Sequence, residues 1–279
     1  SPFEVKKACH YFPFLEENAR ELIQKCGLSY DNSIKNKQHF TENKELDKER
    51  LSNLAKQGMI QRYGNHDPKI EERVDNELAV IDELGFSAYF LITHDIVSYS
   101  IENGFQHVGR GSGANSIVAY CLYITDVDPI ELNLYFERFI NPKRSSPPDF
   151  DIDYSWKERD QILNYIFWRF GHEYTALLGA ISTFKDSSIL RELGKVYGLP
   201  KSDIDNLVAH PGFYVNKDPM YDRIFQFAQK LTNFPNLRTI HAGGVLISEK
   251  PITYYSALDM PPKGYPTTHW DMYSAEDIG

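Results

Sequence analysis

Apolar residues recur at helical spacing along much of the first half of the chain. The pattern predicts a helix over residues 14–26, a second over 51–63 and a third from Pro68 to about Leu84. Pro68 is typical of a first helical position, because its fixed φ suits a helix and its missing N–H would have no partner there. Gly85 ends the third helix. This half of the chain is therefore predicted to be mostly helical.

Apolar runs typical of strands occur at three places. Residues 89–93 are a β-prone run, residues 149–153 alternate aspartate with large apolar side chains, and residues 245–247 resemble a buried strand. Further helices are predicted over 116–124, 129–140, 156–170 and most of 181–240. Strands, an inserted helical block and then a strand again predict a mixed α+β fold.

The composition allows a sizeable core, because 42% of the 279 residues are hydrophobic. We expect no membrane span, since no run of 18 apolar residues occurs. The first residues lack the basic-then-apolar pattern of a signal peptide. The 3 cysteines are far apart and odd in number, which favours a reducing, cytoplasmic location.

The net charge of −9 argues against a protein that grips nucleic acid over its whole surface. A local basic groove is still compatible with it. Residues 181–240 contain 8 Lys or Arg against 6 Asp or Glu, so this helical block is mildly basic within an acidic chain.

The segment from Asp149 to Asp153 carries the most informative chemistry. On a strand, Phe150 and Ile152 would face the core while Asp149, Asp151 and Asp153 share the other face. Like charges about 6–7 Å apart along a strand repel each other unless a cation lies between them. A divalent metal, which prefers oxygen ligands, would supply that cation. The pattern leaves open the alternative of a solvated, acidic edge strand.

A glycine-rich turn at residues 109–116 precedes one of the predicted helices. Glycine allows positive φ and close approach of a ligand, and the free N–H groups of a helix start attract an anion. Arg110 and the Ser112 hydroxyl add a charge and a donor, so the turn favours phosphate binding, with a plain tight turn as the alternative. Gly109, Gly111 and Ala114 also match a loose dinucleotide fingerprint, although the preceding segment is a poor strand.

The two segments together suggest a reaction class. A phosphate-binding turn followed about 40 residues later by an acidic strand is typical of nucleotidyl transfer. The turn would hold a nucleoside triphosphate. The aspartates would hold two divalent ions, which activate a 3′-hydroxyl and stabilise the leaving pyrophosphate.

Several motifs resemble the bacterial C-family DNA polymerases, the family of the DNA polymerase III alpha subunit. They are ELAVIDELGFSAYFLITHDI, VGRGSGANSIVAY, ITDVDPIELNLYFERFINP, PPDFDIDY and HAGGVLIS, and they occur in the family's order. The resemblance implies a palm related to the polymerase-β nucleotidyltransferases, with a helical thumb inserted into it. The palm would be residues 19–180 and 241–279 and the thumb 181–240, with residues 1–18 as the tail of an N-terminal phosphoesterase-like domain.

The resemblance also implies site residues. The catalytic, metal-binding aspartates would be Asp149 and Asp151, with Asp153 as a neighbour rather than a principal ligand. The nucleotide-binding residues would be Arg110, Gly111, Ser112, Arg138, His241, Gly243 and Gly244. The DNA-binding residues would be Lys185, Arg191 and Lys195, for which ordinary solvated helix charges are the alternative. Arg138 could instead pair with Glu137 or Asp128, and His241 could be a structural histidine.

The implied cofactor is Mg²⁺ in a two-metal site. The implied partners are primer–template DNA, deoxynucleoside triphosphates and, for the parent protein, the sliding clamp and other replisome subunits. The family's third catalytic aspartate lies in a Lys-Phe-Asp strand beyond a segment like 271–277, and no such strand occurs in this chain. We therefore expect the 279 residues alone to fold but to extend primers barely or not at all. A DNA- or nucleotide-binding module without catalysis and a dinucleotide-dependent oxidoreductase are the alternatives.

Overall fold

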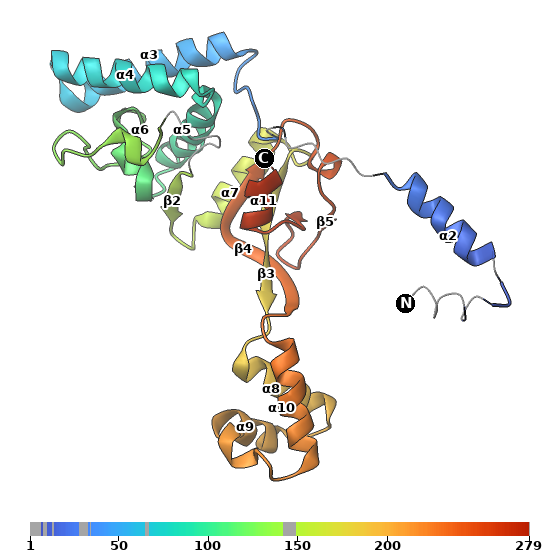
Figure 1. The fold of residues 1–279 in the computed structure, drawn as a ribbon. Coiled ribbons are helices and arrows are strands. Elements are labelled where there is room, and N and C mark those ends of the chain that lie inside the picture. The colour runs from blue at the N-terminus through green and yellow to red at the C-terminus, as the bar shows by residue number, and fades with distance from the viewer. Residues whose placement is uncertain are drawn as a thin grey trace.

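The computed structural model describes residues 7, 10–12, 14–27, 33, 35–64, 67–141 and 149–278. They form a helical lobe, a two-stranded ribbon, a four-stranded sheet and a separate helical unit (Figure 1). Helix α2 (Phe14–Lys25) precedes the lobe and contains no buried residue. No helix among the described residues is both long and apolar enough to span a membrane. The predicted mixed α+β class is confirmed.

The helical lobe consists of α3 (Lys44–Tyr63), α4 (Pro68–Glu83), α5 (Ser87–Glu102) and the short α6 (Ile117–Cys121). Side-chain oxygens of Asn43 and Asp67 accept hydrogen bonds from backbone N–H groups at the starts of α3 and α4, which sets where these helices begin. The four helices enclose one core, whose fully buried members include Leu51, Ile81, Phe90, Ile117 and Phe139. The segment that follows α5 is therefore held on a close-packed support.

The strand predicted at residues 89–93 is wrong, because these residues lie inside α5. Phe90 and Leu91 pack into the lobe core, whereas Ile92 packs into a second cluster against α7 (Arg159–Phe170). A helix that is buried on two sides shows no single apolar stripe. Its sequence therefore looks like a short apolar run rather than an amphipathic helix.

The helix predicted over residues 129–140 is also wrong. This segment forms turns and a short 3₁₀ helix, η2 (Phe136–Arg138). Asp128 Oδ1 accepts a hydrogen bond from Ile130 N at 2.8 Å, and Asn133 has a φ of 49°, so the backbone turns instead of continuing a helix. Helix α6 is shorter than predicted for a similar reason, since Tyr123 just beyond it has a φ of 61°.

The strands form two separate sheets. β1 (His107–Arg110) and β2 (Asp151–Tyr154) make an antiparallel ribbon beside the lobe. The second sheet has the order β4–β3–β6–β5, with β3 antiparallel to β4 and parallel to β6. Its strands are β3 (Thr175–Thr183), β4 (Pro235–Ile247), β5 (Leu258–Asp259) and β6 (Thr267–Thr268), followed by α11 (Met272–Ile278). The strand predicted at 245–247 is thus the end of the much longer β4.

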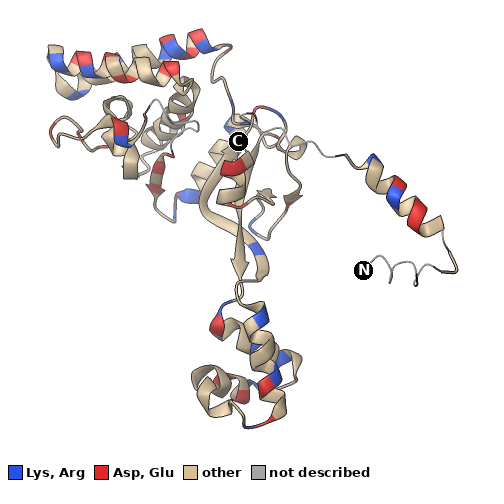
Figure 2. Cartoon of the chain, in the orientation of Figure 1, with Lys and Arg blue, Asp and Glu red and all other residues tan. Residues whose placement is uncertain are grey.

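A three-helix unit lies at the far end of β3 and β4 (Figure 1). It consists of α8 (Asp186–Val196), α9 (Lys201–Ala209) and α10 (Pro219–Leu231), with a short 3₁₀ helix at Pro211–Tyr214. Its own small core contains Ile189, Leu190, Leu193, Leu207 and Ile224. The predicted helical block is therefore confirmed between residues 186 and 231, while its two ends belong to strands. Charges of both signs are distributed over the unit (Figure 2).

Candidate nucleotide and metal site

The antiparallel ribbon brings the glycine-rich turn and the acidic segment together. Its register pairs Arg110 with Asp151 and Val108 with Asp153. Arg110 Nε donates to Asp153 Oδ2 at 2.8 Å, and Arg110 Nη1 lies 3.6 Å from Asp151 Oδ2. The guanidinium of Arg110 therefore lies between the Asp151 and Asp153 carboxylates and is the cation that reduces their repulsion.

The predicted alternation of the acidic strand is confirmed from residue 150 onward. Phe150 packs against Phe90 and Phe139 of the lobe core, with ring centroids 5.1 and 5.0 Å away, and its N–H donates to Tyr89 Oη at 2.9 Å. Asp151 keeps 48% of its side chain exposed. Asp149 is exposed and directly precedes Phe150, outside the strand itself. The partly buried Phe150 ring, packed against the lobe core, therefore anchors the segment that carries both predicted ligands.

Gly111 begins the turn with a φ of 73°, a conformation that L side chains rarely adopt. A Cβ at this position would lie 2.8 Å from Asp151 Oδ2. The positive φ therefore favours glycine here, and any other side chain would also displace the Asp151 carboxylate from its present position. Residues Gly111–Asn115 then form a 3₁₀ turn, which Asn115 closes by donating from Nδ2 to the Ser112 carbonyl at 2.8 Å.

The start of α6 does not present free N–H groups to an external anion. The Glu77 carboxylate of α4 occupies the place that an external anion would take. Its Oε2 accepts from Ser116 Oγ at 2.8 Å and from Val118 N at 3.4 Å. Arg73 Nε pairs with Glu77 Oε1 at 2.7 Å. Burial raises the pKa of the Glu77 carboxyl, while Arg73 and Ser116 oppose that shift. Any phosphate contact must therefore come from the turn itself, at Arg110 to Ser112.

The ribbon faces β4 across a cavity of about 380 Å³. Arg110, Asp151 and Asp153 line one side, and residues 241–244 line the other. Arg159 lines the cavity as well, and its guanidinium donates to the Ala242 carbonyl. The deeper wall is apolar and is formed by Ile92, Ile96, Ile162, Ile166 and Val245. Its polar rim and apolar floor are typical of a small-molecule site.

The HAGG segment has a defined local structure. His241 Nδ1 accepts hydrogen bonds from Gly244 N at 3.0 Å and Gly243 N at 3.3 Å, so the ring proton resides on Nε2. A Cβ on Gly244 would lie 2.6 Å from Leu178 Cβ, which explains glycine where β4 crosses β3. His241 is therefore both a structural cap for its own turn and part of the cavity wall.

The remaining predicted residues lie elsewhere. Arg138 is exposed in η2 and is not among the residues that line the cavity. In the helical unit, Arg191 pairs with Asp205 and Lys195 with Glu192, at 2.8 and 2.7 Å, and Lys185 donates to Asn233. The structure thus brings together the ribbon and the HAGG segment, and it separates both from the three cations of the helical unit.

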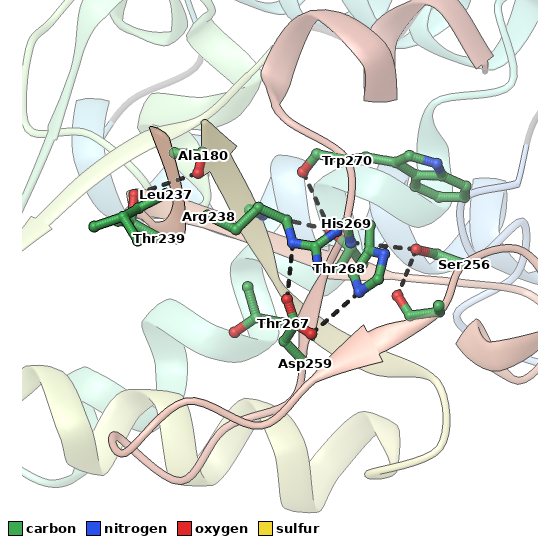
Figure 3. A network of polar contacts seen from close by, with 12 residues as sticks. Ala180, Leu237, Arg238, Thr239, Ser256, Asp259, Thr267, Thr268, His269 and Trp270 are labelled. Atoms are coloured by element: carbon green, nitrogen blue, oxygen red, sulfur yellow. Dashed lines mark hydrogen bonds and ion pairs between the residues drawn. The ribbon is translucent and has the colours of Figure 1, made fainter. Parts of the chain in front are cut away.

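A second polar cluster, which the sequence did not indicate, ties the strands of the larger sheet together (Figure 3). Asp259 accepts from Arg238 Nε at 3.0 Å and lies 3.2 Å from His269 Nε2. The His269 N–H donates to Ser256 Oγ at 3.3 Å. Arg159, the first residue of α7, was missed as well. These contacts connect β4 with β5 and with the residue after β6.

The donor set fits magnesium that is shared with a phosphate ligand. Mg²⁺ is usually held by one or two carboxylates together with substrate phosphates and water. Asp151 provides an exposed carboxylate directly beside the glycine turn, and Asp149 precedes it by two residues. Among the described residues, no group of three or more His, Cys, Asp or Glu side chains could hold an ion alone. A metal here would therefore need ligand oxygens from elsewhere.

The dinucleotide alternative does not fit this geometry. Its fingerprint requires a parallel βαβ unit, whereas β1 pairs antiparallel with β2 and is followed by a helix of only 5 residues. Carboxylates beside a glycine–serine turn at the edge of a cavity are instead compatible with the nucleotidyl-transfer chemistry that the sequence predicts.

Comparison with known proteins identifies the family. Residues 49–279 match the profile of the bacterial DNA polymerase III alpha NTPase domain. The chain belongs to the bacterial DNA polymerase III alpha family.

Some of the curated relatives are named error-prone DNA polymerase and others DNA polymerase III subunit alpha. The error-prone DNA polymerase of Symbiobacterium thermophilum is 34% identical over 82% of this chain and 23% of its own length. The DNA polymerase III subunit alpha of Bacillus subtilis is 35% identical over 82% of this chain and 22% of its own length. That of Halalkalibacterium halodurans is 31% identical over 99% of this chain and 27% of its own length. The chain thus spans about a quarter of the length of these curated relatives.

Proposed function

We propose that this chain forms the nucleotide-binding part of a DNA polymerase that transfers nucleotidyl groups from deoxynucleoside triphosphates to a primer 3′-hydroxyl on a DNA template. The observation that carries the proposal is the β1–β2 register, which places the glycine–serine turn directly beside Asp151. Family membership supports it, because the relatives are named as DNA polymerases. For the whole protein, the sliding clamp and other replisome subunits are proposed partners.

Each site residue has a proposed role. Asp149 and Asp151 would hold Mg²⁺, which when bound lowers the pKa of a hydroxyl and neutralises phosphate charge. Arg110 and Ser112 would contact the triphosphate from the turn, with Gly111 allowing its close approach. His241, Gly243 and Gly244 would form the opposite wall, and Arg138 would approach from η2. Asp153 would orient Arg110 through its hydrogen bond rather than bind metal.

The proposed division of the chain is a tail at 1–18, a palm at 19–180 and 241–279, and a thumb at 181–240. The separate core of α8–α10, at the end of two strands of the larger sheet, supports an inserted unit. Its cations Lys185, Arg191 and Lys195 are proposed to contact DNA.

Titration of the 279-residue chain with a deoxynucleoside triphosphate, with and without Mg²⁺, tests the proposal. Calorimetry should show binding that requires the metal. Mutation of a residue that only hydrogen-bonds to a metal ligand typically weakens metal affinity about 10–100-fold. Asp151→Asn removes a proposed ligand itself, so it should weaken Mg²⁺-dependent triphosphate binding on the order of 100-fold. Asp153→Asn is the matched control and should cost much less. Equal losses for the two variants would contradict the assignment of Asp151 as the ligand.

We also propose that these 279 residues alone extend a primer barely or not at all, because two-metal transfer needs more carboxylate oxygens than Asp149 and Asp151 provide. A primer-extension assay with Mg²⁺ measures this directly. Robust extension by the purified chain, abolished by Asp149→Ala, would show that the site is complete. The same assay separates a catalytic role from the alternative of a module that only binds nucleotide or DNA.

A further inference from the structure

One ion pair inside the lobe lies between the two loops that are proposed to hold the nucleotide. Arg73 and Glu77 are one turn apart on α4, and Arg73 Nε lies 2.7 Å from Glu77 Oε1. The Glu77 side chain is only 1% exposed. Neither residue lines the cavity. Any influence of this pair on the nucleotide must therefore pass through the residues that it contacts.

Glu77 contacts the end of the glycine–serine turn. Its Oε2 accepts from Ser116 Oγ at 2.8 Å, and Ser116 Oγ in turn accepts from Ala119 N at 3.1 Å, which caps α6. The neighbouring Asn115 donates to the Ser112 carbonyl. Glu77 is thus connected through Ser116 and Asn115 to Ser112, one of the proposed phosphate contacts.

Arg73 contacts both loops at once. Its Nη2 lies 3.2 Å from the Leu134 carbonyl, in the segment that leads to η2 and Arg138. The same nitrogen lies 3.5 Å from the Asn115 carbonyl, at the end of the glycine–serine turn. A guanidinium can make these contacts together with its pair to Glu77, because its donors are arranged as a rigid fork, whereas an ammonium is a single compact donor group.

We propose that Arg73 and Glu77 are positioning residues for the nucleotide site, which hold the glycine–serine turn and the segment before η2 in a fixed relation. Ser112 and Arg138 then reach the triphosphate from set positions, so less ordering is left to the binding step. This role rests on the proposed nucleotide-binding function. Glu77 is buried, Arg73 is partly exposed, and neither residue lines the cavity, so the pair acts without direct contact with the ligand.

The most informative variant is Arg73→Lys, because lysine keeps the charge that Glu77 needs but lacks the fork that reaches the two carbonyls. The matched control is Asp75→Asn on the same helix, whose partner Lys56 lies 3.0 Å away in an exposed pair. Both proteins are compared with the wild-type 279-residue chain in three measurements. These are thermal unfolding, amide hydrogen exchange of residues 111–116 and 134–138, and calorimetric binding of a deoxynucleoside triphosphate with Mg²⁺.

Arg73→Lys is expected to unfold near the wild-type temperature, to exchange faster in both loops and to bind the triphosphate about 10-fold more weakly. Asp75→Asn should match the wild type in exchange and in binding. Unchanged exchange in either loop, or wild-type affinity of Arg73→Lys, would overturn the positioning role while leaving the proposed function intact. A wild-type chain that binds no triphosphate would overturn the proposed function and this role with it.

Discussion

Charged side chains are arranged in opposite ways on the β1–β2 ribbon and on the α8–α10 unit. On the ribbon, Arg110 contacts aspartates that lie more than 40 positions away in the sequence, and all of them face a cavity. In the helical unit, Lys195 pairs with a glutamate three residues away and Arg191 with Asp205 of the next helix. The ribbon thus brings opposite charges from distant segments together at one cavity. In the helical unit, charged side chains form ion pairs within the unit, on its exposed surface.

The difference shows that the number of basic residues in a region does not indicate how firmly their side chains are held. Exposed ion pairs contribute little individually, so the pairs of Arg191 and Lys195 hold these side chains only weakly in place. Arg110 is held between two carboxylates, beside a glycine with a positive φ. The charged side chains of the ribbon are therefore held in place by strand pairing and by their contacts with one another.

The first prediction separates the two regions by packing. Leu207 is fully buried in the small core of α8–α10, and Leu→Ala substitutions in cores cost about 2–5 kcal/mol. Leu207→Ala should therefore melt the helical unit and leave binding of Mg²⁺ and triphosphate close to wild type. Hydrogen exchange of residues 186–231 together with calorimetry measures both effects.

Leu122→Ala is the matched control, because Leu122 is equally buried but belongs to the lobe core. It should weaken nucleotide binding as well as stability. If Leu207→Ala abolished nucleotide binding, the helical unit and the ribbon would not be independent of each other.

The second prediction concerns Arg110, which holds Asp153 and approaches Asp151. A hydrogen bond to a charged group contributes about 1.5–3 kcal/mol, so Arg110→Ala should weaken triphosphate binding by about 10-fold or more. Binding of Mg²⁺ alone should strengthen, because the internal cation between the carboxylates is gone. Separate titrations with the metal and with the triphosphate distinguish these effects, and Arg110→Lys should lie between wild type and alanine. Parallel changes in both titrations would contradict the proposed placement of Arg110.

The smallest effect is expected from the triple substitution of Lys185, Arg191 and Lys195 by alanine. Each phosphate contact contributes about 0.9 to the slope of log affinity against log salt concentration. We expect a reduction of a few-fold in primer–template affinity and a shallower slope, measured by fluorescence anisotropy at several salt concentrations. Alanine at Lys201, Lys217 and Lys230 changes the charge of the same unit equally and serves as control. Unchanged affinity and slope in the first triple variant would remove these residues from the DNA contact surface.

The sequence predicted secondary structure correctly where a short segment determines its own conformation. Helix α4 begins at Pro68 and ends before Gly85, as predicted, because a capped amphipathic helix depends on neighbours three and four residues apart. The alternation in 150–154 correctly predicted which side chains of β2 face the core. The prediction failed at 89–93, where burial on two sides removes the periodic signal, and at 129–140, where Asn133 turns the backbone.

The long strands β3 and β4 were largely missed for a different reason. Most of residues 235–243 is exposed, and neither strand is set by its own pattern. Their pairing with each other supplies the hydrogen bonds that hold them, with a register shift between Leu177 and Gly179. Strand preference depends more on the partner than helix preference does.

The sequence by itself determined the residue types of the candidate site, the order of its motifs and the helical character of most of the chain. Only the tertiary structure decided that Arg110 is the cation between Asp151 and Asp153, that Glu77 takes the start of α6, and that the HAGG segment lies across the same cavity. These contacts join residues that are dozens of positions apart. Their distances are set by strand register and core packing, which local periodicity does not contain.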